Sequence, residues 1–287
     1  MSERVTRSRE LVAQGRPAAV VARVAGISRQ AIYRRPRRAP RGHRRPLDEL
    51  DEVVLAVARE DEHVTDGTRM IAAIASRRAG RAINRKRCQR LMREHRLLQP
   101  ARSEGRRRRP GYFQVTRPNE LWHLDMTSIW VAEHGWTYLN AAIDCCTREI
   151  AGWALDVRCR APEATAVIDR AAPERGIEPG QLTLGTDNGS AYTSRAFRKR
   201  LSEHGITHRR GGYRDPESQA FIESWFSKLK LRCIWREEFE TLEQARAALG
   251  AYIDSYHHRP HSGLAYKTPA EVARTWKDHD DHLTPAA

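Results

Sequence analysis

Several features that would place a protein in a membrane or outside the cell are missing from this chain of 287 residues. Its longest purely apolar run is six residues, 53–58, whereas a membrane-spanning helix needs about 20. The first residues contain no apolar segment, so we expect no secretory signal. The five cysteines are odd in number and form no Cys-x-x-Cys pair, which argues against a disulfide framework and a zinc finger. We therefore expect a soluble, cytoplasmic protein.

Acidic residues are scarce in the first part of the chain. Residues 1–110 hold 29 Lys and Arg against 12 Asp and Glu, a net charge of +17, whereas residues 111–287 hold 22 against 24, a net charge of −2. The net charge of the whole chain, +15, indicates a polyanionic partner, most simply nucleic acid. Binding should then be strongly salt-dependent through residues 1–110. Because 40% of the residues are apolar, wholesale disorder is excluded.

The change in composition falls at an Arg-rich stretch that also contains Pro and Gly, which is typical of a linker between domains. We therefore predict five segments: a helix-turn-helix-like unit (1–46), a second helical unit (47–100), a basic linker (101–118), an α/β domain with a C-terminal helix (119–274) and a tail (275–287).

The first unit has the pattern of a helix-turn-helix. Its apolar helix face is expected from Ala18, Val20, Val21 and Val24. A turn at Gly26 and an N-cap at Ser28 precede a second helix over residues 29–35. Helix, turn and capped helix are typical of DNA-binding proteins. The second helix would present Arg29, Gln30, Tyr33 and Arg34 to DNA. A plain helical hairpin is the alternative.

In the second unit the sequence predicts three helices, of which the last is strongly basic. Asn84 should cap it, and Cys88, Leu91 and Met92 should face inward. Its polar side carries Arg85, Lys86, Arg87, Arg90, Arg93 and Arg96. Such a face repels itself unless an anion lies against it. We expect DNA phosphate to be that anion, contacted by Arg85, Lys86, Arg87 and Arg90; a solvated face is the alternative.

The α/β domain should contain a mixed sheet covered by helices, because three strands are followed by alternating helices and strands. The strands are expected at residues 121–131, 138–145, 150–157, 181–186 and 206–208. The helices are expected at residues 162–173, 194–204, 216–231 and 242–256.

Three acids stand out in this domain. Asp125 lies within the first strand between apolar residues, where an unpartnered carboxylate is costly. Asp187 follows a strand at its carboxyl end, where α/β sites gather. Glu223 lies within a helix that also carries Lys228 and Lys230, two of the six lysines of the chain. The alternative is that these acids are ordinary caps and surface groups.

Four stretches together resemble the catalytic subunit of bacterial insertion-sequence transposases of the DDE class. They are Trp122-His123-Leu124-Asp125-Met126-Thr127, Thr186-Asp187-Asn188-Gly189-Ser190, Pro216-Glu217-Ser218 with Ile222-Glu223-Ser224-Trp225-Phe226, and Arg259-Pro260-His261-Ser262-Gly263-Leu264. The nearest group is the IS-three family, whose second reading frame encodes this product. The resemblance covers roughly residues 48–274. One departure is Tyr256, where the family often has Asn; we expect a structural role for it.

The resemblance implies a ribonuclease-H-like core, as in retroviral integrases, with Asp125, Asp187 and Glu223 as catalytic residues and metal ligands. Mg²⁺ or Mn²⁺, two ions per site, is the implied cofactor, since hard cations prefer carboxylate oxygens. Lys230, on the face of Glu223, is expected to contact DNA phosphate, whereas Lys228 is expected to be solvated. His123 is expected to be packed or to lie behind the metal ligands, Asp144 to support strand packing or a turn, and Asn188 to shape the loop of Asp187.

The implied function is metal-dependent cleavage and strand transfer at the ends of an insertion sequence. The implied partners are double-stranded DNA, further copies of the chain on that DNA and a protein from a frameshifted upstream frame; the implied location is the bacterial nucleoid. Two alternatives remain open at this stage. The chain could be a catalytically silent DNA-binding regulator or relic, or a cellular nuclease that hydrolyses DNA without joining it.

Overall fold

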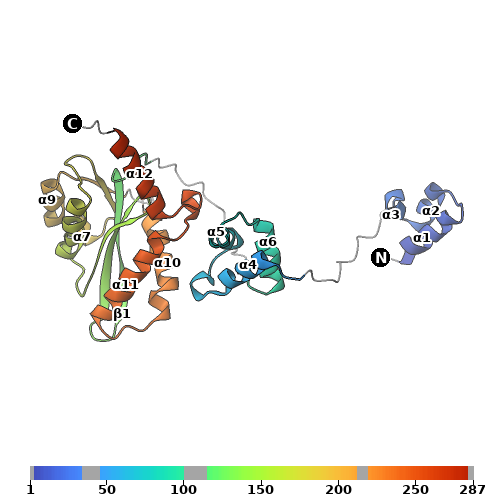
Figure 1. Cartoon of the computed structure of the whole chain (residues 1–287), viewed down its shortest axis with the longest axis horizontal. Helices are drawn as coiled ribbons and strands as arrows, with labels where there is room; N and C mark the ends of the chain where they lie inside the picture. Colours follow the sequence, from blue (N-terminus) through green and yellow to red (C-terminus); the bar gives the residue numbers. More distant parts are fainter. Residues whose placement is uncertain (1–2, 34–45, 100–114, 212–218, 284–287) are drawn as a thin grey trace. The chain divides into compact units, whose positions relative to one another are not determined.

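The computed structural model describes residues 3–33, 46–99, 115–211 and 219–283. The chain divides into two compact units, residues 1–49 and 50–287, and each is considered separately (Figure 1). Within the described residues, no helix is both long and apolar enough to cross a membrane. The proposed division into five segments stays a prediction. Its last boundary meets a continuous helix, however, since α12 runs from Pro269–Leu283 across the expected start of the tail at residue 275.

The first unit is a small three-helix arrangement in which the predicted helix, turn and capped helix are present. Its helices are α1 (Glu3–Ala13), α2 (Ala18–Ala25) and α3 (Arg29–Tyr33). Gly26 ends α2 in the left-handed conformation, with φ 63°. The Ser28 hydroxyl accepts a hydrogen bond from the Ala31 amide at 3.2 Å, which confirms the N-cap. The expected apolar face is partly wrong: Val21 is buried as predicted, but Val20 and Val24 are 54% and 84% exposed.

The second compact unit, residues 50–287, begins with a helical segment built around one apolar cluster. It contains α4 (Glu49–Arg59), the short helix η1 (Asp61–His63), α5 (Thr68–Arg78) and α6 (Arg85–Glu94). Asn84 caps α6 through a 2.8 Å hydrogen bond from the Lys86 amide. Cys88, Leu91 and Met92 are buried in the cluster as predicted, so the apolar spacing of this basic helix was read correctly.

A mixed five-stranded sheet forms the centre of the α/β domain, as predicted. Its strands are β1 (Leu121–Val131), β2 (Gly135–Asp144), β3 (Ile150–Asp156), β4 (Thr183–Thr186) and β5 (Thr207–Arg210). The order across the sheet is β3-β2-β1-β4-β5. Strands β1 to β3 pair antiparallel, whereas β4 pairs parallel with both β1 and β5. The long strand β1 therefore lies in the middle, next to the carboxyl end of β4.

Helices cover both faces of this sheet and bury two apolar clusters. One face packs against α7 (Ala161–Glu174), α8 (Ser190–Thr193) and α9 (Arg195–Glu203); the other packs against α10 (Ala220–Arg232) and α11 (Leu242–His257). In Figure 1, α10 and α11 are the orange helices beside β1. Successive side chains of a strand face opposite sides. Trp122 and Leu124 belong to the α7 cluster, and Ile129 and Val131 to the α10 cluster.

Candidate active site

Asp125 is placed on the α10 side of the sheet by the two-residue period of β1. Its position shares parity with His123, Thr127 and Ile129, and the His123 ring stacks on Phe221 of α10 with ring centroids 5.9 Å apart. The carboxylate is partly buried, and its Oδ1 accepts a hydrogen bond from the Met126 amide at 2.7 Å. A half-buried acid in the central strand is thus oriented by its own backbone.

Asp187 lies beside β1 because β4, the strand that it follows, runs parallel to β1. The register pairs His123 with Gly185, so two further residues along each strand bring Asp125 and Asp187 side by side. A side chain at Gly185 would meet the His123 ring at 2.9 Å, which explains the glycine. The Gly189 amide donates to Asp187 Oδ1 at 2.8 Å, and the Asn188 amide donates to the Gly211 carbonyl at 3.0 Å. Asn188 therefore shapes this loop, as predicted.

Glu223 comes from the first turn of α10, the helix that packs its Ile222, Trp225 and Phe226 side chains onto the sheet. Because residues three and four apart share a helix face, this apolar stripe leaves Glu223 on an exposed side. The residues 212–218, where the sequence motif of this helix begins, lie outside the described residues. The three acids therefore come from a central strand, a strand end and a helix.

The charges of Asp187 and Glu223 both act on Asp125. The pKa of Asp125 is raised to about 6, chiefly by burial and in part by these two carboxylates, while the hydrogen bond from the Met126 amide and the Lys230 ammonium oppose the shift. Like charges with hard oxygen donors form the environment that a divalent cation relieves. The donor set consequently fits Mg²⁺ or Mn²⁺. The assignment of Asp125, Asp187 and Glu223 as catalytic residues and metal ligands stays a prediction.

The raised pKa of Asp125 gives a pH-dependent prediction for the metal-free protein. Below about pH 4 the carboxyl is protonated in both folded and unfolded chains, and above about pH 6 it is charged in both. Burial of the charged carboxylate therefore destabilises the folded protein, and this destabilisation grows as the pH rises from about 4 to about 6. We expect Asp125→Asn to be more stable than the original protein by on the order of 2 kcal/mol at pH 7 and equally stable at pH 4.

Thermal unfolding in the presence of a chelator, measured across this pH range, checks the prediction. Asp156→Asn, on β3 of the same sheet, is the control and should show no such growth with pH. A variant Asp125→Asn that is destabilised equally at pH 4 and pH 7 would contradict the account.

Two neighbours of the site have the structural roles that the sequence indicated. His123 is buried and packed, and burial lowers its pKa to about 4. Asp144 is fully buried and accepts hydrogen bonds from the Cys146 and Thr147 amides at 2.7 and 2.9 Å, which holds the turn after β2. Tyr256 is buried as well, and its hydroxyl donates to the Arg148 carbonyl at 2.8 Å.

The predicted DNA contacts of the two helical segments are exposed to different degrees. On α3, Arg29, Gln30 and Tyr33 are exposed, whereas Arg34 lies outside the described residues. On α6, Arg85 and Lys86 are exposed. Arg87 and Arg90 instead contact Asp51 of α4 at 2.6 and 3.4 Å. The anion that this helix requires is therefore, in part, a buried carboxylate of the chain itself, and the assignment of these residues to DNA stays a prediction.

Lys228 differs from its sequence expectation. It is partly buried, and burial together with the charge of Arg232 lowers its pKa. Lys230, at the face of Glu223, acts on the pKa of Asp125 as described above. The expectation that Lys228 is solvated is wrong because the C-terminal segment and the residues around Asp66 pack beside this side of α10.

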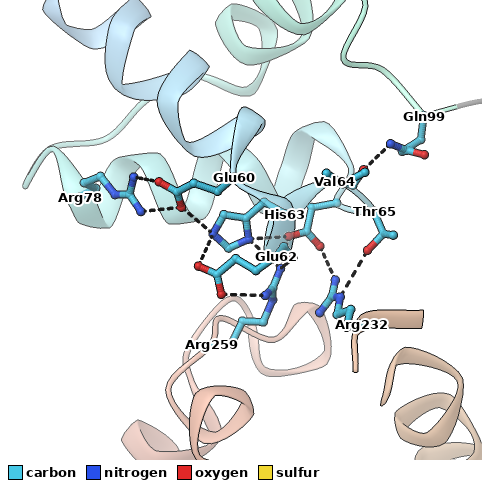
Figure 2. A network of polar contacts seen from close by, with 10 residues as sticks. Glu60, Glu62, His63, Val64, Thr65, Arg78, Gln99, Arg232 and Arg259 are labelled. Carbon is cyan, nitrogen blue, oxygen red and sulfur yellow. Dashed lines mark hydrogen bonds and ion pairs between the residues drawn. The ribbon is translucent and has the colours of Figure 1, made fainter. Parts of the chain in front are cut away.

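A polar network that the sequence did not reveal joins the helical segment to α10 and the C-terminal motif (Figure 2). Asp66 Oδ1 accepts from Arg232 at 2.6 Å, and its Oδ2 accepts from Arg259. All three side chains are nearly buried, with exposed fractions of 5%, 12% and 11%. Burial alone would raise the pKa of Asp66, but the hydrogen bond from His63 and the two arginine charges outweigh it and lower the pKa.

The acids around this network also account for a group that resembles a metal site. Glu60, Glu62 and His63 bring potential ligand atoms within 4.8 Å of one another. Cations of the chain already meet these acids, however: Arg78 pairs with Glu60, and Arg259 approaches Glu62 at 3.9 Å. Figure 2 shows the guanidinium groups directed at the carboxylates. We therefore assign the group to the ionic network and not to a metal.

Comparison with known families agrees with the geometry of the sheet and the acids. Residues 115–216 match the model of the family described as "Integrase core domain", and residues 204–269 match a second model with the same description. Together with the mixed five-stranded sheet, this match confirms the predicted ribonuclease-H-like α/β class. The part of the chain that carries Asp125, Asp187 and Glu223 is an integrase core domain.

The curated relatives are transposases of insertion sequences, as the motifs indicated. The chain is 34% identical over 164 residues to the transposase for insertion sequence element IS904 of Lactococcus lactis, covering 56% of this chain and 64% of that protein. It is 31% identical over 147 residues to transposase InsF for insertion sequence IS3A of Escherichia coli, covering 51% and 50%. The matches thus span about half to two thirds of these relatives.

Similar solved structures come from retroviral proteins. A chain of the simian T-cell lymphotropic virus intasome, in complex with PP2A regulatory subunit B56 gamma, aligns with a TM-score of 0.49 at 16% identity, covering 70% of this chain and 69% of that one. The HTLV-2 integrase catalytic core domain in complex with magnesium aligns with a TM-score of 0.40 at 17% identity, covering 55% and 97%.

Proposed function

We propose that this protein is a DDE transposase that cuts and joins the ends of an insertion sequence, with Asp125, Asp187 and Glu223 as its catalytic residues. The observation that carries the proposal is the convergence of three carboxylates at the centre of an integrase core domain. The similarity to insertion-sequence transposases supports the ends of an insertion sequence as the substrate.

DNA cleavage and strand transfer are phosphoryl transfers, in which catalysis is largely positioning and charge stabilisation. Bound divalent ions, two per site by the resemblance, would activate the attacking oxygen and stabilise the leaving one. By the resemblance, the carboxylates of Asp125, Asp187 and Glu223 would together hold these ions. The backbone amides of Met126 and Gly189 fix the orientation of Asp125 and Asp187.

The basic helical segments would hold the DNA, while the near-neutral core performs the chemistry. Exposed Arg29, Gln30 and Tyr33 of α3, with Arg34, suit the element end, and Arg85 and Lys86 of α6 suit phosphate. Lys230, close enough to Asp125 to act on its pKa, suits a phosphate near the reacting bond. Two element ends must be held together for joining, so we propose further copies of the chain as partners on DNA, in the nucleoid, and a frameshift partner.

A strand-joining assay with labelled DNA ends of the element tests the proposal. The protein should nick the DNA and join the new 3′ end to a second duplex when Mg²⁺ or Mn²⁺ is present, and a chelator should stop both steps. Hydrolysis without joined product would favour a nuclease. DNA binding with neither product under either ion would favour a regulator or relic, and would overturn the proposed activity.

A further inference from the structure

A cavity of about 350 Å³ lies beside α10, on a different side of the helix from Lys230. Most of its lining is polar and includes Thr65, Arg69, Ser224, Ser227, Lys228 and His261. Ser224 is the neighbour of Glu223, and Lys228 follows it by four residues, so both lie on one face of the helix. The cavity thus begins one residue from the candidate catalytic glutamate.

The charges around this cavity are unbalanced. Arg232 and Arg259 share the carboxylate of Asp66, and Arg259 also approaches Glu62 at 3.9 Å. Lys228, by contrast, has no hydrogen bond and no carboxylate within 4.0 Å among residues 219–283 or the other described parts of the chain. A partly buried ammonium with no partner is unfavourable. Accordingly its burial and the nearby arginine charge lower its pKa.

Further hydrogen-bond donors line the cavity beside Lys228. The Nδ1 atom of His261 accepts a hydrogen bond from the Gly263 amide at 3.1 Å, so in the neutral ring Nε2 carries the proton and is a donor. A smaller adjoining cavity of about 40 Å³ is lined by Arg148, Lys228 and His261. Two nitrogens of Arg148, Nε and Nη1, are buried without a hydrogen-bond partner in the described residues.

We infer that this cavity is a phosphate-binding site, in which Lys228, supported by His261 and the hydroxyls of Ser224 and Ser227, takes a backbone phosphate of the DNA strand held at the carboxylate triad. The inference rests on the proposed function for its ligand. Lys228 lies about 7.5 Å beyond Glu223 along the helix axis at 1.5 Å per residue. That distance corresponds to about two base-pair steps of a duplex, at about 3.4 Å each along the duplex axis.

The experiment measures the affinity for a double-stranded oligonucleotide as a function of salt, without divalent ions, so it does not depend on catalysis. Lys228→Met should weaken binding roughly fivefold to tenfold and lower the slope of log K against log salt by about 1, the contribution of one phosphate contact. Lys228→Arg should restore the slope because it keeps the charge. The matched control is Lys199→Met, whose lysine is 77% exposed on α9 and should change neither quantity.

Thermal unfolding separates binding from a structural role. Because Lys228 has no hydrogen bond and no carboxylate within 4.0 Å among the described residues, Lys228→Met should leave the unfolding temperature unchanged or raise it while DNA binding weakens. A lower unfolding temperature with an unchanged salt slope would overturn the site. So would equal effects of Lys228→Met and Lys199→Met on affinity.

A second measurement uses the unaltered protein. DNA should protect Lys228, but not Lys199, from an amine-acetylating reagent, as read by peptide mass spectrometry. Equal modification of Lys228 with and without DNA would overturn the inference. If strand joining fails in the assay above while DNA still protects Lys228, the proposed activity falls and the phosphate site stands.

Discussion

Glu223→Gln should reduce cleavage and joining by on the order of a thousandfold in Mg²⁺ while DNA binding persists. The substitution keeps the size of the side chain but removes one of the two charges that raise the pKa of Asp125. Loss of one preorganised charge at a phosphoryl-transfer site typically costs 10²- to about 10³-fold in rate. Binding should survive because most of the positive charge lies in residues 1–110.

The measurement is a gel assay for joined product with labelled element ends, run beside a binding assay at equal protein concentration. Glu203→Gln is the matched control, because Glu203 lies on α9 and pairs with Arg200 at an exposed surface. Its joining rate should equal that of the original protein. Undiminished joining by Glu223→Gln would remove Glu223 from the catalytic set and, with it, the DDE assignment.

Asp66→Asn should lower the free energy of unfolding of the second unit by about 3–5 kcal/mol. The amide has the shape of the carboxylate but leaves Arg232 and Arg259, which are 12% and 11% exposed, without their shared counter-charge. Removing one partner of a buried ion pair costs this much because the remaining charges stay desolvated. For a unit of this size the unfolding temperature should fall by roughly 6–15 °C.

Thermal or denaturant unfolding measures the effect, with Asp61→Asn on the exposed side of η1 as the control. A double-mutant cycle with Arg259→Met isolates the pair: the second substitution should cost less in the Asp66→Asn background than alone. Additive losses, or a loss no larger than that of Asp61→Asn, would show that the network contributes little. The original protein and Asp66→Asn should also differ in how their stability changes at acid pH. The lowered pKa of Asp66 means that its stabilisation is complete above about pH 4 and is lost as the pH falls below.

The sequence predicted best what depends on local periodicity. Strand β1 was placed at its observed bounds, because its apolar residues are flanked by turn residues on both sides. The caps at Ser28 and Asn84 were also predicted correctly, since an N-cap needs only a side-chain oxygen and a following helix. The carboxylate triad rests on motif resemblance and stays a prediction, and the parallel pairing of β1 with β4 is consistent with it.

Long-range ionic contacts could not be predicted in the same way. Asp66 and Arg259 are 193 residues apart, and no periodic pattern relates them. Arg87 looked like a DNA contact because the sequence shows only the charges of its own helix and hides Asp51 on another. Lys228 and Lys230 lie on one helix, so the sequence alone could not say which would be buried by segments that pack there from elsewhere in the chain.

The sharing of Asp66 by two arginines bears on how such proteins can exchange parts. An ancestor that acquired a different helical segment in front of the same core would have lost the carboxylate and kept Arg232 and Arg259. Natural or engineered chimeras should therefore succeed only when the incoming segment brings an acid at the position of Asp66, or when both arginines change with it. The helical segment, for which we propose a role in holding DNA, is thus inherited together with two residues of the core.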